Sequence, residues 1–316
     1  MYILLVSRGV PSKKDPIWGC FEFDQARALK AIGHKVVVLS VDERIRFHKR
    51  QLGVSHVNID GIDCYNYCFL PKKISDIFGF NISTKISVAQ YYFLLEKIIK
   101  EQGTPDIIYS HYLTVSYFAV FLRKKLNIPL VAIEHWSEVN KDKLHSNVKR
   151  LGDLTYRNVD KLISVSDPLK NIIEKHFGTK SIVVHNMIGE HFCNQQFNFA
   201  FPNKIKFVTT GRLVYGKGFD LLPKAFDKLN LPKDKWEMNI IVGGEEYDNL
   251  QRQIKELGLS DNIHLLGQKT KDQIVDILKE NNVFILPSRG ENFSVAVLEA
   301  LSCGLPVISS ICGGIR

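Results

Sequence analysis

The sequence predicts two α/β domains, each built on an open parallel sheet. In both halves of the chain, short apolar runs with strand character alternate with longer stretches of helical periodicity. Alternation of this kind, with short connections, is typical of βαβ units and therefore of parallel sheets with helices on both faces. The 316 residues, 45% of them hydrophobic, are enough for two domains that each have a core.

The first half opens with a buried-strand run at Tyr2–Ser7, a helical stretch at Phe21–Ile32 and a second strand at Lys35–Val41. The short break at Gly33 and His34 fits the return of a βαβ unit. The elements expected after these are strands at Ile59–Asp63 and Cys64–Leu70, a helix at Ser87–Gln102, a strand at Pro105–His111, a helix at Ser116–Lys125, and strands at Pro129–Glu134, Leu162–Val165 and Ile182–Val184.

The second half shows the same alternation of strands and helices. The expected strands are Lys206–Thr210, Met238–Val242, Ile263–Leu266, Val283–Leu286 and Pro306–Ser309, and the expected helices are Leu221–Leu229, Asp248–Leu257, Lys271–Asn281 and Val295–Leu301. Ser294 suits the N-cap of the last helix and Gly304 its C′ position. We therefore expect an N-terminal domain at residues 1–190, a linker at 191–203 and a C-terminal domain at 204–316.

Composition narrows the class of protein. Residues 1–190 hold 27 Lys and Arg against 19 Asp and Glu, so most of the net charge of +9 lies in the first half. A basic half suits nucleic acid, an anionic membrane, an acidic substrate or a solvated surface. Nucleic acid is disfavoured because aromatic residues, apart from Phe47, are not interleaved with the basic clusters. Six cysteines without CxxC or zinc-like spacing predict free thiols in a reduced, cytoplasmic protein.

Glycine-bearing loops follow successive strands of the second half and include Gly211, Gly243 and Gly267. In an open parallel sheet these loops share one edge, where ligands bind. The first loop also brings two cations, Arg212 and Lys217. A guanidinium can grip a phosphate through two bonds while a lysine acts as a point charge.

Two carboxylates stand eight residues apart at the same edge, Glu291 in a loop and Glu299 in the helix after it. Glutamates are usually exposed, so both could be solvated surface residues. A helix start near Phe293 and Ser294 would offer free N–H groups to an anion. Cations, carboxylates and N–H groups at one edge describe a site for a diphosphate joined to polyhydroxylated groups.

With these motifs, the chain resembles glycosyltransferase family 4, which has the GT-B fold. The resemblance is strongest in the E-x7-E block at residues 287–310, in the Gly-Gly pair after it, and in the G-R-x4-K-G loop at residues 211–218. It implies two Rossmann-like domains that face a central cleft, and a retaining transferase that uses no metal or other cofactor. Family members continue past the Gly-Gly pair, so the resemblance also implies a truncated second domain.

The resemblance implies a role for each matching residue. Arg212 and Lys217 would hold the donor diphosphate and stabilise its charge as it leaves. Glu299 would hydrogen-bond the ribose, and Glu291 would bind hydroxyls of the transferred sugar. His135 would face that sugar from the first domain. The other implied donor contacts are Gly19, Gly211, Gly243, Gly267, Gln268, Asn292, Phe293 and Ser294.

The implied function is transfer of a sugar from a nucleotide-sugar, with UDP-sugar favoured, to a saccharide or lipid-linked saccharide in cell-surface polysaccharide synthesis. Basic clusters at Arg44–Arg50, Lys72-Lys73 and Arg123–Lys125 suit peripheral contact with the inner face of the plasma membrane. Two alternatives stay open. One is a GT-B-fold nucleotide-sugar epimerase, and the other is a non-catalytic subunit that binds a nucleotide-sugar or assembles with a partner.

Overall fold

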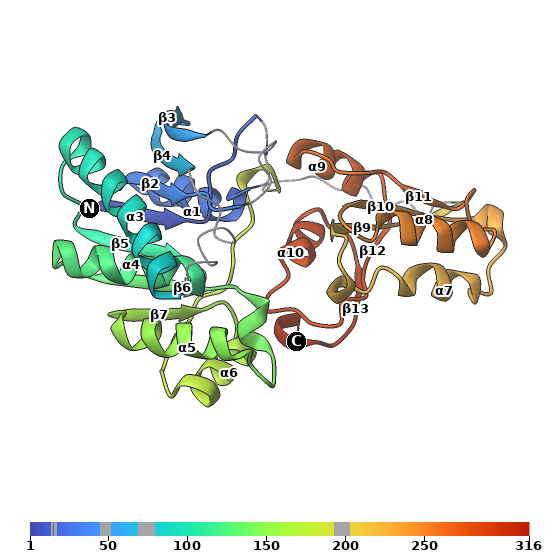
Figure 1. Cartoon of the computed structure of the whole chain (residues 1–316). Coiled ribbons are helices and arrows are strands. Elements are labelled where there is room, and N and C mark those ends of the chain that lie inside the picture. Colours follow the sequence, from blue (N-terminus) through green and yellow to red (C-terminus); the bar gives the residue numbers. More distant parts are fainter. Residues whose placement is uncertain (14, 16–17, 45–51, 69–79, 193–202, 316) are drawn as a thin grey trace. The chain divides into compact units, whose positions relative to one another are not determined.

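The computed structural model describes the chain except for residues 14, 16–17, 45–51, 69–79, 193–202 and 316. The chain forms two compact units, unit 1 at Met1–His185 and unit 2 at Asn186–Arg316 (Figure 1). Most of the expected linker, most of the 44–50 segment and Lys72-Lys73 lie outside the described residues. Within the described ranges, no helix is long and apolar enough to cross a membrane.

Unit 1 is built on one eight-stranded sheet in the order β3-β4-β2-β1-β5-β6-β7-β8. Its strands are β1 Tyr2–Ser7, β2 Lys35–Val41, β3 Gly53–Ile59, β4 Ile62–Cys68, β5 Ile107–His111, β6 Leu130–Glu134, β7 Lys161–Ser164 and β8 Ile182–Val183. All neighbours pair in parallel except β3 with β4. The order reverses between β1 and β5, which is where ligands bind in open α/β sheets.

Helices cover both faces of this sheet. They are α1 Cys20–Ala31, α3 Phe80–Gln102, α4 Leu113–Leu126, α5 Ser146–Thr155 and α6 Asp167–Phe177. Leu4 of β1 packs with α3 and α4 on one face, whereas its neighbour Leu5 packs with Phe23 of α1 on the other. Successive residues of a strand point to opposite faces, so a continuous apolar run feeds two cores at once.

The hairpin at β3 and β4 corrects the sequence prediction. The strand expected at Cys64–Leu70 is confirmed for Cys64–Cys68, which belong to β4, and residues 69–70 lie outside the described residues. The strand expected at Ile59–Asp63 is wrong, because Ile59 and Ile62 pair across a two-residue turn at Asp60 and Gly61. Both turn residues have positive φ, 54° and 71°. That conformation belongs to the type I′ hairpin turn, for which Asp-Gly is a favoured sequence. The signal was present in the sequence and places the turn two residues before the expected boundary.

Unit 2 carries a five-stranded parallel sheet in the order β11-β10-β9-β12-β13. Its strands are β9 Ile205–Arg212, β10 Trp236–Gly243, β11 Ile263–Leu265, β12 Val283–Leu286 and β13 Val307–Ser309, and its helices are α7 Leu221–Asp227, α8 Tyr247–Glu256, α9 Lys271–Lys279 and α10 Val295–Ser302. The α/β prediction with parallel sheets is confirmed. The strand order reverses between β9 and β12, so the loops after these two strands flank the expected ligand crevice.

Figure 1 shows the helices of unit 2 beside its sheet. Two cores hold these helices against the sheet. One core joins α7 and α8 to Trp236, Met238 and Ile240 of β10. The other joins α9 and α10 to Phe284 and Leu286 of β12. Because β12 and α10 share a core, the loop between them is anchored at both ends. This loop contains Glu291.

Candidate active site

The loops after β9 and β12 meet at the switch point of unit 2. Gly218, in the β9 loop, has φ of 68°. A Cβ on Gly218 would lie 2.0 Å from the carbonyl oxygen of Pro287, the first residue after β12. Arg289 extends this contact, because its backbone N–H donates to the carbonyl oxygen of Gly216 at 2.9 Å. A glycine is therefore needed at 218 to let the two backbones touch.

Lys217 and Glu291 join these two loops through their side chains. Lys217 Nζ lies 2.6 Å from Glu291 Oε1, and Ser288 Oγ donates to the same oxygen at 2.6 Å. The Glu291 side chain is 9% exposed and that of Lys217 is 26% exposed. Glu291 is therefore buried and hydrogen-bonded, unlike a solvated surface glutamate. The structure brings together two predicted site residues that stand 74 positions apart in the chain.

The backbone of Glu291 is held from the other side by the last described residues. Gly314 N–H donates to the Glu291 carbonyl oxygen at 3.0 Å. A Cβ on Gly313 would lie 1.8 Å from that same oxygen. Ser310 Oγ donates to the carbonyl oxygen of Ser288. The Gly-Gly pair noted in the sequence thus packs directly on the Glu291 loop and restricts where its carboxylate lies.

Helix α10 begins immediately after this loop, as predicted. Ser294 is its N-cap, and its side chain accepts from the Val297 N–H at 3.3 Å. Glu299 lies one and a half turns into the helix and is partly buried. Asn292 and Ser294 are buried, and Phe293 is partly buried. The N-terminus of α10 therefore stands beside Glu291 at the same sheet edge, where its free N–H groups favour an anion.

The remaining contacts predicted in unit 2 also lie at the carboxyl edge of this sheet. Gly211 and Arg212 end β9, and Arg212 is exposed. Gly243 ends β10, and its carbonyl oxygen accepts from the Leu213 N–H at 3.1 Å. A Cβ on Gly243 would lie 3.6 Å from the Gln268 side chain, so the loops after β10 and β11 touch. The sheet thus gathers the loops of four strands along one edge.

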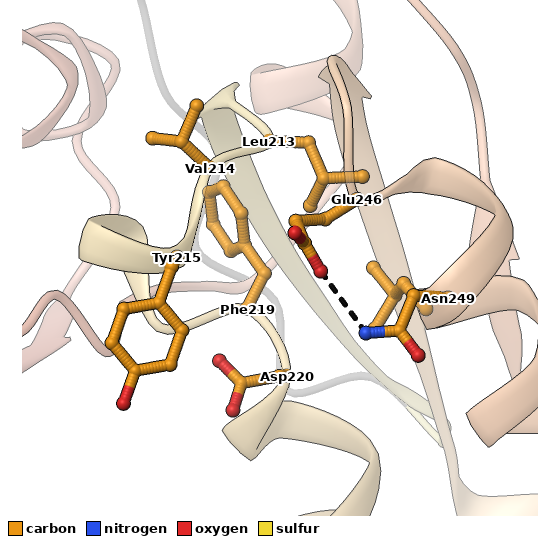
Figure 2. A pocket seen from close by; sticks show the side chains of 8 residues that line it. Leu213, Val214, Tyr215, Phe219, Asp220, Glu246 and Asn249 are labelled. Carbon is orange, nitrogen blue, oxygen red and sulfur yellow. Dashed lines mark hydrogen bonds between the residues drawn. The ribbon is translucent and has the colours of Figure 1, made fainter.

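A small hollow behind the β9 loop was not predicted. Figure 2 shows its lining, which comes from the β9 loop and the start of α8. The lining residues are Leu213, Val214, Tyr215, Phe219, Asp220, Glu246, Asn249 and Leu250. Its volume is about 130 Å³, below the roughly 300–1,000 Å³ of ligand pockets. We interpret it as a packing hollow that supports the β9 loop.

Arg289, in the loop after β12, binds residues of the β9 loop. Its guanidinium binds the Asp220 carboxylate through two bonds of 2.7 Å each. It also lies 4.0 Å from the centroid of the Tyr215 ring. The pairing with Arg289 lowers the pKa of Asp220 below its usual value. Arg289 is therefore engaged in the scaffold, whereas Arg212 presents an exposed cation at the same edge.

The switch point of unit 1 contains a second group of polar residues. Gly19 is the N-cap of α1, and a Cβ there would lie 2.1 Å from the carbonyl oxygen of Gly9. Arg8 comes directly after β1, and its Nε lies 2.9 Å from Glu22 Oε1. Its guanidinium carbon lies 3.5 Å from the centroid of the Tyr112 ring. Sequence reasoning found Gly19 but missed Arg8 and Tyr112. Arg8 and Tyr112 each come directly after a predicted strand, and this position could have marked them as residues of the ligand-binding edge.

His135 follows β6 in a turn that Glu134 holds in place. Glu134 Oε1 accepts from the N–H groups of His135 and Trp136 at 2.9 and 2.6 Å. Tyr156 Oη donates to Glu134 Oε2 at 2.6 Å. Burial raises the pKa of Glu134 to about 7, although these hydrogen bonds act in the opposite direction. The backbone at His135 is therefore fixed by a buried carboxyl group.

The side chain of His135 contacts a second histidine that the sequence analysis did not single out. His111 Nδ1 lies 3.2 Å from His135 Nε2, and the two rings are parallel to within 2°. His111 ends β5 and is fully buried. Burial, with a contribution from the charge of Arg8, lowers the pKa of His111 to about 3. His111 is therefore a neutral imidazole at pH 7.

Unit 1 has a hollow of about 440 Å³ whose lining residues come after His135 in the chain. Its lining combines an aromatic ring with basic side chains. The lining residues are Trp136, Glu138, Lys141, Lys143, Leu144, His145 and Val148. Lys141 is neutralised by Glu138 at 2.7 Å. An aromatic face beside cations is suited to a saccharide that carries a negative charge.

Two doubly wound units, one with a Lys–Glu pair at its switch point, fit a glycosyltransferase of the GT-B type, and the family models assign that class. The chain belongs to glycosyltransferase family 4. The sequence model described as Glycosyltransferase Family 4 matches residues 23–190, more than half of the chain. The one described as Glycosyl transferases group 1 matches residues 194–316.

Individual proteins agree with this assignment. The GPI3 subunit of phosphatidylinositol N-acetylglucosaminyltransferase from Saccharomyces cerevisiae is 24% identical over 297 residues, which cover 90% of this chain and 62% of the yeast protein. This chain spans 40–62% of the length of the curated relatives it matches.

Solved structures show the same fold. Sucrose-phosphate synthase from Thermosynechococcus elongatus superposes with a TM-score of 0.76 at 17% identity, covering all of this chain and 82% of that protein. HepE of Anabaena, in complex with UDP and glucose, gives a TM-score of 0.69 at 17% identity, covering 99% of this chain and 82% of that protein. At these identities the likeness concerns the fold alone.

Proposed function

We propose that the chain transfers a sugar from a nucleotide-sugar, with UDP-sugar favoured, to a saccharide or lipid-linked saccharide, with retention of anomeric configuration. The observation that carries the proposal is the Lys217–Glu291 pair at the switch point of unit 2, beside the exposed Arg212 and the start of α10. The Anabaena protein whose structure contains UDP and glucose supports the choice of donor.

The proposed roles follow from charge. Arg212 and Lys217 bind the diphosphate, together with N–H groups at the start of α10 near Phe293 and Ser294. As the sugar–phosphate bond breaks, negative charge grows on the bridging oxygen. Cations already fixed at that oxygen lower the barrier by several kcal/mol in typical enzymes. When the donor binds, Lys217 would exchange part of its contact with Glu291 for phosphate oxygens.

The carboxylates and loops then select the rest of the donor. Glu291, freed in part from Lys217, accepts from hydroxyls of the transferred sugar, and His135 contacts the same sugar. Glu299 accepts from the ribose hydroxyls. The nucleobase lies against Gly267 and Gln268. The other proposed donor contacts are Gly19, Gly211, Gly243 and Asn292. In this scheme the acceptor hydroxyl attacks from the face that the diphosphate leaves, and the leaving phosphate takes its proton.

The acceptor is proposed to be a saccharide, free or linked to a lipid, in the synthesis of a cell-surface polysaccharide. The aromatic and basic hollow after His135 supports an acceptor with a negative charge. The yeast relative, whose name specifies transfer to phosphatidylinositol, supports a lipid-linked acceptor. Such an acceptor would bring the chain to the inner face of the plasma membrane as a peripheral protein.

A donor panel tests the function. The protein is incubated with UDP- and GDP-sugars, and the products are resolved by chromatography and NMR. Release of free sugar with its anomeric configuration retained is expected with one of the UDP-sugars. An epimerised donor would instead indicate an epimerase, and binding of a donor without any product would indicate a non-catalytic subunit. Either of these results would overturn the proposal.

A further inference from the structure

His111, the last residue of β5, and His135, the residue after β6, contact each other through their rings. His111 Nδ1 and His135 Nε2 are 3.2 Å apart, which is a hydrogen bond between two ring nitrogens. The ring centroids are 5.4 Å apart and the planes agree within 2°. The rings are thus joined nitrogen to nitrogen in a common orientation. One of these nitrogens must carry a proton and the other must accept it.

The surroundings of His111 decide which nitrogen donates. At neutral pH the His111 ring carries a single proton, because burial lowers its pKa to about 3. Its other nitrogen, Nε2, is buried and has no hydrogen-bond partner among the described residues. A proton on Nε2 would leave a buried N–H group without an acceptor, which folded proteins rarely tolerate. A proton on Nδ1 instead makes the hydrogen bond and leaves only a lone pair at Nε2.

We infer that His111 is a positioning residue that donates from Nδ1 to His135 Nε2 and thereby keeps the proton of neutral His135 on Nδ1. This inference rests on the proposed function only where it concerns catalysis, since His135 is there the residue that contacts the transferred sugar. The tautomer decides whether His135 offers that sugar a donor or an acceptor. His135 then acts toward its ligand as a hydrogen-bond donor from Nδ1.

The rings around the pair hold this arrangement in place. The Tyr112 ring lies 5.0 Å from His135, centroid to centroid, and the Tyr109 ring lies 4.8 Å from His111 in an edge contact. Glu134 fixes the His135 backbone through its N–H group. His135 therefore has both its main chain and one ring nitrogen determined by buried groups. Such supporting contacts are what position a reactive side chain in an active site.

The direct test is the tautomer of His135, which imidazole ¹⁵N chemical shifts report. Long-range ¹H–¹⁵N spectra of the full chain, assigned by comparison with H135N, are recorded at pH 7.5. We expect the Nδ1–H pattern for His135 in the wild type. In H111L, which removes the donor at similar volume, the signal should move to the Nε2–H pattern. An Nε2–H pattern in the wild type, or an unchanged pattern in H111L, would overturn the inference.

Activity is a second readout, and H111N is the matched variant because its amide can donate from nearly the position of Nδ1. With an active donor from the panel, H111L should lose roughly 10-fold or more in kcat with little change in donor KM, and H111N should recover most of that loss. Equal losses in both variants would indicate a structural role only. If the wild type transfers no sugar at all, the proposed function fails, while the tautomer measurement still decides the inference.

Discussion

At the level of single residues, Lys217 has a structural role and a proposed catalytic role, and mutations can separate the two. It neutralises a buried carboxylate in the structure, and it is proposed to hold the diphosphate. Lys217→Ala should lower the free energy of unfolding by about 1–3 kcal/mol, because Glu291 loses its charged partner. K217A combined with E291Q should recover most of this stability. Chemical denaturation of the wild type and the two variants measures both effects.

Turnover should not recover in the double variant as stability does. The double variant K217A/E291Q should stay as slow as K217A, because neither variant supplies a cation to the leaving phosphate. A double variant that regains wild-type kcat would show that Lys217 serves the fold and not the reaction.

Glu134 gives stability a dependence on pH. Burial raises its pKa in the folded chain to about 7, above the ordinary value of 4.5. The folded state therefore binds a proton more readily than the unfolded state. The stabilisation from that proton is complete below pH 4.5 and is lost as pH rises through 7. Relative to E134Q, the wild type should lose up to roughly 3 kcal/mol between pH 5 and pH 8.

Unfolding by urea at several pH values measures this difference. Gln is the matched replacement because its oxygen can still accept from the two backbone N–H groups and its amide can reach Tyr156 Oη. If the stability of the wild type and of E134Q changes with pH in parallel, Glu134 does not titrate in this range.

At the element scale, Gly218 sets the contact between the β9 and β12 loops. Gly218→Ala should be more destabilising than Gly258→Ala, although the two glycines have similar φ values of 68° and 62°. Both changes place a side chain in the left-handed region, which costs about 1–2 kcal/mol. Only at 218 does the new Cβ meet another backbone, whereas at 258 nothing lies within 4 Å.

Thermal unfolding of the two variants is the measurement, and G258A is the control for backbone strain alone. Equal losses in Tm would mean that the loops do not need their close approach at Gly218.

The elements also show how far the sequence alone could go. The strands of unit 2 and the Ser294 N-cap follow from apolar runs and local capping chemistry. Helix α6 was missed although its signals are local, since Ser166 caps it and Leu169, Ile173 and Phe177 recur at four-residue spacing. The pairs Lys217–Glu291 and His111–His135 could not be predicted, because they depend on which strands become neighbours in the sheet.

At the scale of the whole molecule, the basic first half is less available than its composition suggests. Arg123 binds Asp160 at 2.7 Å, Lys125 binds Glu96 at 2.6 Å, and Arg44 pairs with Asp15 and Asp42. The Arg123 and Lys125 pairs are largely exposed and contribute little to stability, whereas Asp15 and Asp42 are buried. All of these pairs cancel positive charge that an anionic membrane would otherwise attract. The proposed membrane contact therefore rests on the other cations of unit 1.

Co-sedimentation with liposomes tests that contact. Vesicles rich in anionic lipid should retain more protein than neutral vesicles at low salt, and added salt should release it because surface charge is screened. Equal sedimentation with both kinds of vesicle would contradict membrane docking and would leave a free saccharide as the proposed acceptor.

We propose that unit 2 holds a nucleoside diphosphate at the switch point of its sheet, with Arg212 as an exposed cation. Calorimetric titration of UDP and GDP into the wild type, R212A and R252A tests it most directly. Arg252 is an exposed arginine of α8 and serves as the matched control. We expect saturable binding of UDP that R212A weakens roughly 10-fold or more and that R252A leaves unchanged. Equal binding by R212A and R252A, or no binding of either nucleotide by the wild type, would contradict it.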